Sequence, residues 1–423
     1  MKKEESMKKN KMKKGIGILL AGTILAWNLT AGVQGEDGLE KAREAYQAGQ
    51  EILKWEKEGM GIKETDPLFQ GDYLEAAGTS TADWIAFSAA RMGLDEGMEN
   101  YRNRLTDYVE EKYKTETKLS PNKATEWHRI SLTLEALGTD PRDVGQSHIN
   151  LIADGVYNRD KTTALDQQGV NGLIWGLITL DSGQYETPDD ASADREQLIE
   201  RILEQRTEDG GFSVTGKEGD VDLTAMALSA LAPYQDSKQE FTVTNVNTGE
   251  TTTEVLSETV EGLKNWLASC QNESGTFTSA GVESLESTAQ VIIALSALGE
   301  DAAQEEAFYK DGKDLIEILL SYQMKDGGFC HDLEKKESDE VASQQALLAI
   351  TAYCRAQSGM GSVFSFTDGG TEETLAEIYG REEAQGIPAV AAIAAGVVII
   401  VAAAVVVIKK RKGNKTEEWI EEE

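Results

Sequence analysis

Two aspartates, Asp220 and Asp222, carry carboxyl groups, which can transfer protons in general acid catalysis. They stand just before an apolar stretch that opens at Thr224. Acids in the first turn of a helix are also purely structural, because they accept its free N–H groups and meet its positive end. We favour the structural interpretation and keep Asp222, with Asp220 beside it, as the candidate general acid.

A second group of side chains has the chemistry to bind a flat or sugar-like ligand by stacking and hydrogen bonding. Aromatic rings stack on such ligands, but they also fill helix–helix contacts, and the sequence leaves both interpretations open. The candidates recur near the starts of apolar stretches or are polar residues inside them: Trp84, Trp127, His128, Trp175, Gln290 and Gln344.

Metal-ligating side chains are scarce, because the chain has 3 cysteines and 3 histidines. Cys330-His331-Asp332 is an adjacent group of ligand-type residues. A catalytic zinc needs three protein ligands placed around it, and neighbours in one loop seldom provide them. We therefore predict a solvated loop there, with no metal and no cofactor. A disulfide between Cys270 and Cys330 stays open for an oxidising exterior.

A repeated pattern must position these residues. Each copy has a Gln, a Gly turn, a Phe, a loop, and then Thr or Ser opening an Ala/Leu-rich stretch. The three clear copies run from Gln205 through Phe212 to Thr224, from Gln271 through Phe277 to Thr288, and from Gln323 through Phe329 to Ser343. Weaker copies of the apolar half start near residues 81, 125 and 171. We expect Thr224, Thr288 and Ser343 to be the N-caps of buried helices.

Charged amphipathic segments alternate with the apolar stretches, and we predict outer helices at 37–58, 95–114, 140–154, 192–206, 255–271 and 304–324. Six amphipathic helices that alternate with six apolar helices predict an all-α fold, an α/α toroid of six helical hairpins. The Thr- and Val-rich run 241–253 predicts a β-hairpin insertion that turns at Asn247–Gly249.

The repeat resembles the prenyltransferase/squalene-cyclase repeat of the α/α toroid superfamily. The resemblance is strong over residues 195–357 and extends weakly back to about residue 37. That superfamily includes protein prenyltransferases, terpenoid cyclases, complement thioester domains and cobalamin carriers. The resemblance implies the toroid fold, and it leaves the chemistry open because this fold hosts several activities.

The cyclase motif is present only in part. Class II terpenoid cyclases use Asp-x-Asp-Asp, often followed by Thr-Ala, and the middle Asp protonates the substrate. This chain reads Asp220-Val221-Asp222-Leu223-Thr224-Ala225, so the resemblance implies Asp222 as general acid while Leu223 replaces the last Asp. Protein prenyltransferases hold zinc with Asp-x-Cys at this turn and a later His. Here Asp222 stands at the Cys position and Asp339–Ser343 contains no His, so no zinc site is implied.

The two ends of the chain predict export and anchoring. Residues 1–35, with seven lysines before a short apolar run, are typical of a signal peptide, although an uncleaved anchor stays open. Residues 386–408 carry no charge and predict one transmembrane helix, and the basic start of the tail 409–423 places that tail in the cytoplasm. The toroid domain then spans 36–357, followed by a linker or stalk at 358–385.

Charge limits the partners. The 423-residue chain has a net charge of −33, and residues 36–385 alone reach −38, with 29 basic and 67 acidic side chains. A phosphate backbone is therefore not a partner, because nucleic-acid binding needs clustered Lys and Arg. The lysine-rich start and low cysteine content are typical of a Gram-positive cell surface.

We predict a surface-anchored toroid that binds a small molecule or a surface protein. The resemblance to cobalamin carriers makes a corrinoid one such ligand, although residues 358–385 are too short to supply the β domain that those carriers add. A terpenoid cyclase with Asp222 as acid is the alternative from another class, and we lean against an enzyme. A surface spacer or adhesion module without a ligand is the third interpretation.

Overall fold

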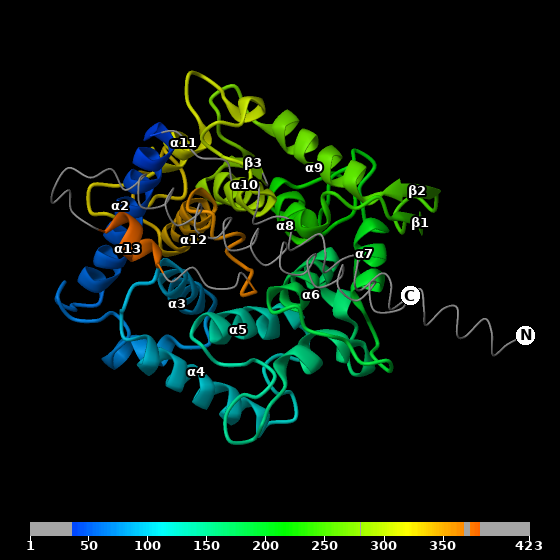
Figure 1. Ribbon diagram of the computed structural model, residues 1–423, viewed down its shortest axis with the longest axis horizontal. Helices are drawn as coiled ribbons and strands as arrows, with labels where there is room; N and C mark the ends of the chain where they lie inside the picture. Colours follow the sequence, from blue (N-terminus) through cyan, green and yellow to red (C-terminus); the bar gives the residue numbers. More distant parts are fainter. Residues whose placement is uncertain (1–35, 280, 368–372, 381–423) are drawn as a thin grey trace, which may run out of the picture.

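Helices form two concentric rings in the computed structural model, which describes residues 36–279, 281–367 and 373–380 (Figure 1). Each inner helix packs against the next and the last packs against the first, so the inner ring is closed. The inner helices are α3 (Ser80–Met92), α5 (Ala124–Ala136), α6 (Val170–Ser182), α8 (Val221–Leu231), α10 (Leu285–Leu298) and α12 (Glu340–Gln357). They begin within three residues of the predicted starts, which confirms the α/α toroid.

The outer ring covers the seams of the inner one. In the described ranges its α-helices are α2 (Glu36–Gly59), α4 (Met98–Tyr113), α7 (Arg195–Leu203), α9 (Leu256–Cys270) and α11 (Leu315–Leu320). The first of them, α2, packs against α12 and α11. The N-terminal helix therefore covers the last inner helix, and the two ends of the domain close the toroid together.

Two outer segments differ from the prediction. Residues 140–154 do not form a helix of that length; an isolated bridge joins Val144 to Ile149, and a π-helical turn, η2, spans Ala153–Tyr157. Pro141 has no N–H to donate, and Gly145 has a φ of 67°, so the regular pattern is interrupted early. In the segment 304–324, α11 is short because Asp314 caps it with a capping box only at Leu315.

Small elements connect the rings. The predicted hairpin is confirmed as β1 (Glu240–Thr244) paired antiparallel with β2 (Thr251–Val255). A second hairpin that the sequence did not indicate pairs β3 (Thr278–Ser279) with β4 (Val282–Glu283). The remaining short helices are η1 (Gly71–Ala76), η3 (Arg159–Lys161), η4 (Leu165–Gln168), η5 (Ala232–Tyr234), η6 (Glu306–Phe308) and α13 (Leu375–Tyr379).

The repeat positions Thr224, Thr288 and Ser343 are not N-caps. They occupy the fourth position of α8, α10 and α12, and the caps are Asp220, Ser284 and Asp339. The predicted caps were wrong because, in the first and third copies, the hydroxyls accept hydrogen bonds from the preceding turn instead of capping the helix. Thr224 Oγ1 accepts the N–H of Phe212 at 2.9 Å, and Ser343 Oγ accepts the N–H of Phe329 at 2.8 Å. The repeat therefore ties the Gly-Phe turn to the inner helix.

Glycine at the turn lets an outer helix approach closely. A Cβ on Gly219 would lie 2.4 Å from the ring of Trp266 in α9, and one on Gly328 would lie 2.9 Å from the ring of Trp55 in α2. No side chain fits at such a distance without displacement of the ring. Trp55 thus packs the N-terminal helix onto the last repeat turn and helps to close the toroid.

No helix of the described residues is long and apolar enough to cross a membrane. The predicted signal peptide at 1–35 and the predicted span at 386–408 lie outside those residues.

Candidate ligand-binding site

One stripe on the inner helices stays partly exposed while their other faces are buried. The stripe uses the second and sixth helical positions, which lie on one face because they are four residues apart. Its members include Thr125 and Arg129 on α5, Asn171 and Trp175 on α6, and Asp222 and Met226 on α8. Because neighbouring helices cover the sides and the outer ring covers the back, this stripe faces the interior of the inner ring.

The carboxylate end of this interior is built around Asp222. Asp220 caps α8, accepting the N–H of Leu223 at 3.1 Å, and also accepts the hydroxyl of Ser279 at 2.6 Å. Asp222 is half-buried, and its Oδ1 has no hydrogen-bond partner within the described part of the chain. Burial raises the pKa of Asp222 to about 6; the hydroxyls of Ser287 and Ser279 oppose this shift, and the negative charges of Asp220 and Glu286 add to it. The pair predicted from sequence is thus together, and Asp222 is the member that keeps an oxygen without a partner.

A histidine and a glutamate join this group from the next repeats. His331 Nδ1 lies 2.9 and 2.8 Å from the two carboxylate oxygens of Glu286, which is the second residue of α10 as Asp222 is of α8. The carbonyl of His331 also accepts the N–H of Leu285 at 3.0 Å. The loop that looked merely solvated is therefore fastened to the start of α10.

The sequence singled out neither Glu286 nor His331 for this site. Glu286 was findable, since it stands two residues before Thr288 as Asp222 does before Thr224. His331 has no such signal, because only the fold brings its loop to α10. Within the described ranges, no group of three or more His, Cys, Asp or Glu side chains is arranged to hold a metal ion.

Two of the predicted tryptophans meet inside the ring. The ring centroids of Trp84 on α3 and Trp175 on α6 are 5.3 Å apart. Since α5 separates α3 from α6 in the ring, these side chains touch only across the interior. Phe364 joins them, with centroid distances of 6.2 Å to Trp84 and 5.5 Å to Trp175. We call Trp84, Trp175, Phe87 and Phe364 the aromatic layer.

Trp127 and His128 point to the outer layer instead. Trp127 Nε1–H donates to the hydroxyl of Tyr113 in α4 at 2.9 Å, and Arg159 lies over its ring. His128 Nε2 lies 2.8 Å from the carbonyl oxygen of Gly155 in η2, and burial lowers the pKa of His128 to about 4. The structure therefore does not bring these two residues together with Trp84 and Trp175.

The predicted glutamines have different surroundings. Gln290 is buried and donates from Nε2 to Oε1 of Gln345 at 2.7 Å, which joins α10 to α12 at the sixth helical position. Gln344 is buried as well, and its Nε2 has no partner among the residues that the structure describes. Of the two, Gln290 borders the interior stripe.

The cysteines are all free. Cys330 and Cys354 are buried, Cys270 is half-buried, and the disulfide left open between Cys270 and Cys330 is not formed. Burial raises the pKa of the Cys354 thiol beyond its usual range, so it is inert.

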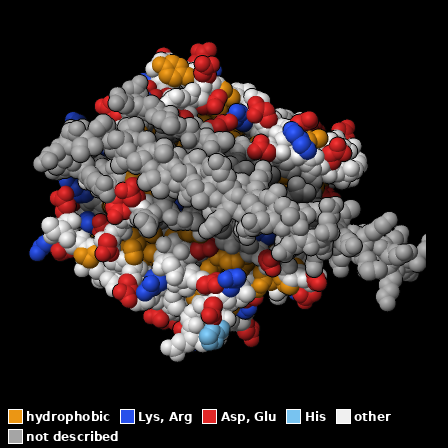
Figure 2. Space-filling view, viewed as in Figure 1, with side chains coloured by type: hydrophobic (Ala, Val, Ile, Leu, Met, Phe, Trp, Pro, Cys, Tyr) orange, Lys and Arg blue, Asp and Glu red, His pale blue; other side chains and the backbone are white. Residues whose placement is uncertain are grey.

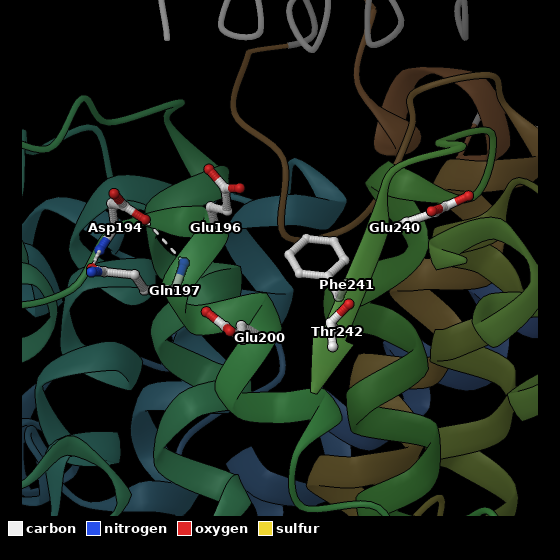
Figure 3. Close-up of a pocket in the computed structure, with 7 residues that line it drawn as sticks. All are labelled: Asp194, Glu196, Gln197, Glu200, Glu240, Phe241 and Thr242. Atoms are coloured by element: carbon white, nitrogen blue, oxygen red, sulfur yellow. Dashed lines mark hydrogen bonds between the residues drawn. The ribbon is translucent and has the colours of Figure 1, made fainter. Parts of the chain in front are cut away.

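A separate pocket of about 360 Å³ lies on the outer surface. Figure 3 shows Glu196 and Glu200 of α7 on one side and Glu240 of β1 on the other, with the Phe241 ring between them. None of its lining residues belongs to an inner helix. Figure 2 shows further Asp and Glu side chains around the edge of the described part of the molecule, in keeping with the net charge of −33 of the whole chain. This pocket belongs to the acidic surface rather than to the ring interior.

The comparisons with known proteins identify the family of the domain. The family model described as the prenyltransferase alpha-alpha toroid domain matches residues 145–249 and 242–420, more than half of the chain. A solved structure, Candida albicans protein geranylgeranyltransferase-I complexed with GGPP, is similar to it at 14% identity, with a TM-score of 0.46, over 73% of this chain and 91% of that chain. The bound GGPP is a property of that enzyme. No curated protein matches the chain.

Proposed function

The chain belongs to the prenyltransferase alpha-alpha toroid family, and on that premise we propose that it is a ligand-binding toroid whose ligand enters the inner ring at the carboxylate end. One observation carries the proposal. Asp222 is half-buried beside the interior, its Oδ1 has no partner among the described residues, and Glu286 occupies the same second helical position in α10. A carboxylate oxygen that is removed from water and left without a donor is costly, and a ligand donor would relieve that cost.

The aromatic layer complements this polar end. Trp175 stands at the sixth position of α6 and is half-buried, whereas Asp222 stands at the second position of α8. Four residues along parallel helices correspond to roughly 6 Å. A ligand with a donor or cationic head and a compact apolar body suits that spacing, since the head meets carboxylates and the body meets a ring face.

A second part of the proposal concerns location. We propose that the toroid lies outside a bacterial membrane, most simply that of a Gram-positive cell, held by the span at 386–408 with the tail inside. The uncharged run and the basic residues that follow it support this arrangement. Protease treatment of intact cells should remove the toroid and leave a tail epitope protected; complete protection of the toroid would contradict it.

The binding proposal is tested by thermal unfolding of the purified protein with a panel of organic amines, sugars, cobalamin and squalene. A true ligand at a hundredfold excess over its Kd should stabilise the fold by about 2.7 kcal/mol. Asp222→Asn should lose that stabilisation. Glu200→Gln, in the outer pocket, is the matched control and should keep it. A panel without any shift far above micromolar concentration overturns the proposal and favours a spacer or adhesion module.

A terpenoid cyclase is the second candidate, and the raised pKa of Asp222 is the observation that favours it. A pKa near 6 keeps part of the group protonated close to neutral pH, as general acid catalysis needs. Protonation of an unactivated alkene needs a stronger acid than this, so binding remains the better supported function. If the protein converts squalene or a polyprenyl substrate and Asp222→Asn abolishes that conversion, terpenoid cyclisation becomes the better supported function.

A further inference from the structure

Strand β1 has one edge that no other strand covers. Within the described residues its sheet contains β1 and β2 alone. The N–H of Leu256 donates to the carbonyl of Gln239 at 3.0 Å, just outside the ladder. Because hydrogen-bonded and non-hydrogen-bonded pairs alternate along an antiparallel ladder, Phe241 bonds to β2 and Thr242 does not. The N–H and the carbonyl of Thr242 therefore point away from β2.

The outer pocket lies beside this strand. Its volume is about 360 Å³, and it is lined by Thr242 and Glu240 on the strand side and by Glu196 and Glu200 on the α7 side. Figure 3 shows the two sides facing each other, with the Phe241 ring between them. No described residue outside β2 bonds to the backbone of Thr242. The strand thus keeps a free donor and a free acceptor next to open space. We call Glu196, Glu200 and Glu240 the pocket glutamates.

Two hydrogen bonds between α7 and the hairpin mark the ends of the open edge. Before β1, Gln239 Nε2 donates to Glu196 Oε1 at 3.2 Å, and after it the N–H of Val246 donates to the carbonyl of Glu204 at 2.8 Å. The 5 residues of β1 lie between these bonds. A strand advances about 3.3 Å per residue, so a segment of about three to five residues can lie along the edge, and a longer chain must leave toward the solvent.

The acids of the pocket are not neutralised by the protein itself. The two arginines of α7 pair elsewhere, Arg195 with Asp181 and Arg201 with Asp160. Across the described part of the chain, no ion pair reaches a pocket glutamate, whereas the fourth lining acid, Asp194, is occupied as the N-cap of α7. The pocket therefore has an uncompensated negative charge, which attracts a cationic partner.

The spacing of the acids on α7 matches that of an extended chain. Glu196 and Glu200 are four residues apart and share one helix face, which separates them by about 6 Å along the axis. Alternate residues of a strand share a face and are about 6.6 Å apart. Two basic side chains at alternate positions of a segment laid along β1 can therefore meet these two carboxylates.

We propose that the outer pocket binds a short basic segment of a partner protein as an added strand on β1. The main chain of the segment pairs with the free edge at Thr242, and lysine or arginine at alternate positions faces the pocket glutamates. Main-chain pairing gives affinity, and the charges select the sequence. This inference goes beyond the proposed function, because no residue of an inner helix lines the pocket.

Synthetic peptides with blocked ends test the proposal directly, with affinity for the purified protein measured by calorimetry. A peptide that alternates lysine with valine should bind, and its affinity should fall as the salt concentration rises. The same peptide with glutamate in place of lysine should not bind. Two further versions of the lysine peptide carry N-methyl groups on one or the other set of alternate backbone nitrogens. One of them should bind at least about tenfold more weakly, because its donors to β1 are blocked.

A proline scan of the hairpin tests the strand edge from the side of the protein. Thr242→Pro removes the outward N–H without removing a bond to β2 and should weaken binding about two- to tenfold. Thr253 is the cross-strand partner of Thr242, and its N–H points to the opposite edge of the hairpin. Thr253→Pro is therefore the matched control and should leave the affinity unchanged.

Charge variants keep the test decisive if the proline variant unfolds. Glu200→Gln and Glu240→Gln should each weaken binding of the lysine peptide about two- to fivefold, and the exposed Glu111→Gln on α4 should not. Failure of the lysine peptide to bind the wild type overturns the proposal. Unchanged affinity of both N-methylated versions also overturns it, because the peptide would then be held by charge without pairing to β1.

Discussion

The two halves of the inner ring are joined by different interactions. In the first half, α3 and α5 are linked by the fully buried Asp83, which pairs with Arg129 at 2.9 Å and accepts the hydroxyl of Tyr101 at 2.7 Å. In the second half, the turns before α8 and α12 are fastened by neutral bonds from Phe N–H groups to Thr224 and Ser343. Two of the three clear repeats thus share the same local bond, whereas α3 and α5 of the weaker repeats are joined by a buried ion pair.

The candidate site takes one component from each half. The tryptophans come from the first half and the carboxylates Asp222 and Glu286 from the second. Strict repetition would give every inner helix the same inward residue. Divergence between the halves therefore gives the ring interior an apolar side and a polar side.

Loss of the buried ion pair should be the most damaging change. Arg129→Met leaves the Asp83 carboxylate buried without its cation, which should cost about 3–5 kcal/mol in the free energy of unfolding measured by urea denaturation. Arg142→Met, which breaks the exposed pair with Asp140, should cost less than about 1 kcal/mol. Equal losses in the two variants would show that the first half does not depend on its buried charges.

The second largest loss of stability should come from a larger side chain at Gly328, in the turn that packs against α2. Gly328→Ala places a Cβ 2.7 Å from that of Ser338 and 2.9 Å from the Trp55 ring, so the unfolding free energy should fall by about 1–3 kcal/mol. Gly262→Ala, on α9 with open space around it, should instead stabilise by about 0.5–1 kcal/mol. Thermal unfolding of both variants checks this prediction. An unfolding midpoint of Gly328→Ala equal to that of the wild type would mean that α2 shifts to accommodate the added methyl group at little cost.

The repeat hydroxyls offer a sharper comparison within the second half. Thr224→Val removes the acceptor of the buried Phe212 N–H and should cost about 1–2 kcal/mol. Thr288→Val changes the same repeat position, but its buried hydroxyl has no partner among the described residues, so the change should be neutral or stabilising. Urea denaturation of the pair measures the difference. Similar losses would show that the valine methyl, not the hydrogen bond, sets the cost.

The smallest effect should be the pH dependence due to Asp222. Its folded pKa, about 6, exceeds the unfolded value near 3.9, so the folded state retains the proton more strongly. Its contribution to stability is complete below pH 4 and is lost as the pH rises from about 4 to about 6. Asp222→Asn should therefore flatten the stability profile in that window by about 1 kcal/mol, after allowance for partial exposure. Urea denaturation across this pH range measures the profiles, with Asp190→Asn as an exposed control. If the profiles of the wild type and the Asp222→Asn variant run parallel, the pKa shift is contradicted.

Sequence reasoning succeeded where the signal was local and repeated. The apolar stretches predicted the inner helices, because a helix that is buried on most of its faces must be apolar on most of them. The pattern was less informative at 140–154 and 304–324, where helical charge patterns coincide with Pro141 and with the late cap at Asp314. Thr224 and Ser343 have the right chemistry for caps, but their partner, a Phe N–H, comes from the preceding turn.

By itself, the sequence determined the toroid, the paired aspartates and the candidate aromatic residues, since these follow from periodicity and residue type. Only the tertiary structure decided which of them meet. It separates Trp127 and His128 from Trp84 and Trp175, and it brings His331 to Glu286 from another repeat. The physical reason is that closing a ring sets contacts between helices that are not neighbours in sequence. A residue such as Phe364 therefore becomes part of the interior although nothing adjacent to it in the chain indicates so.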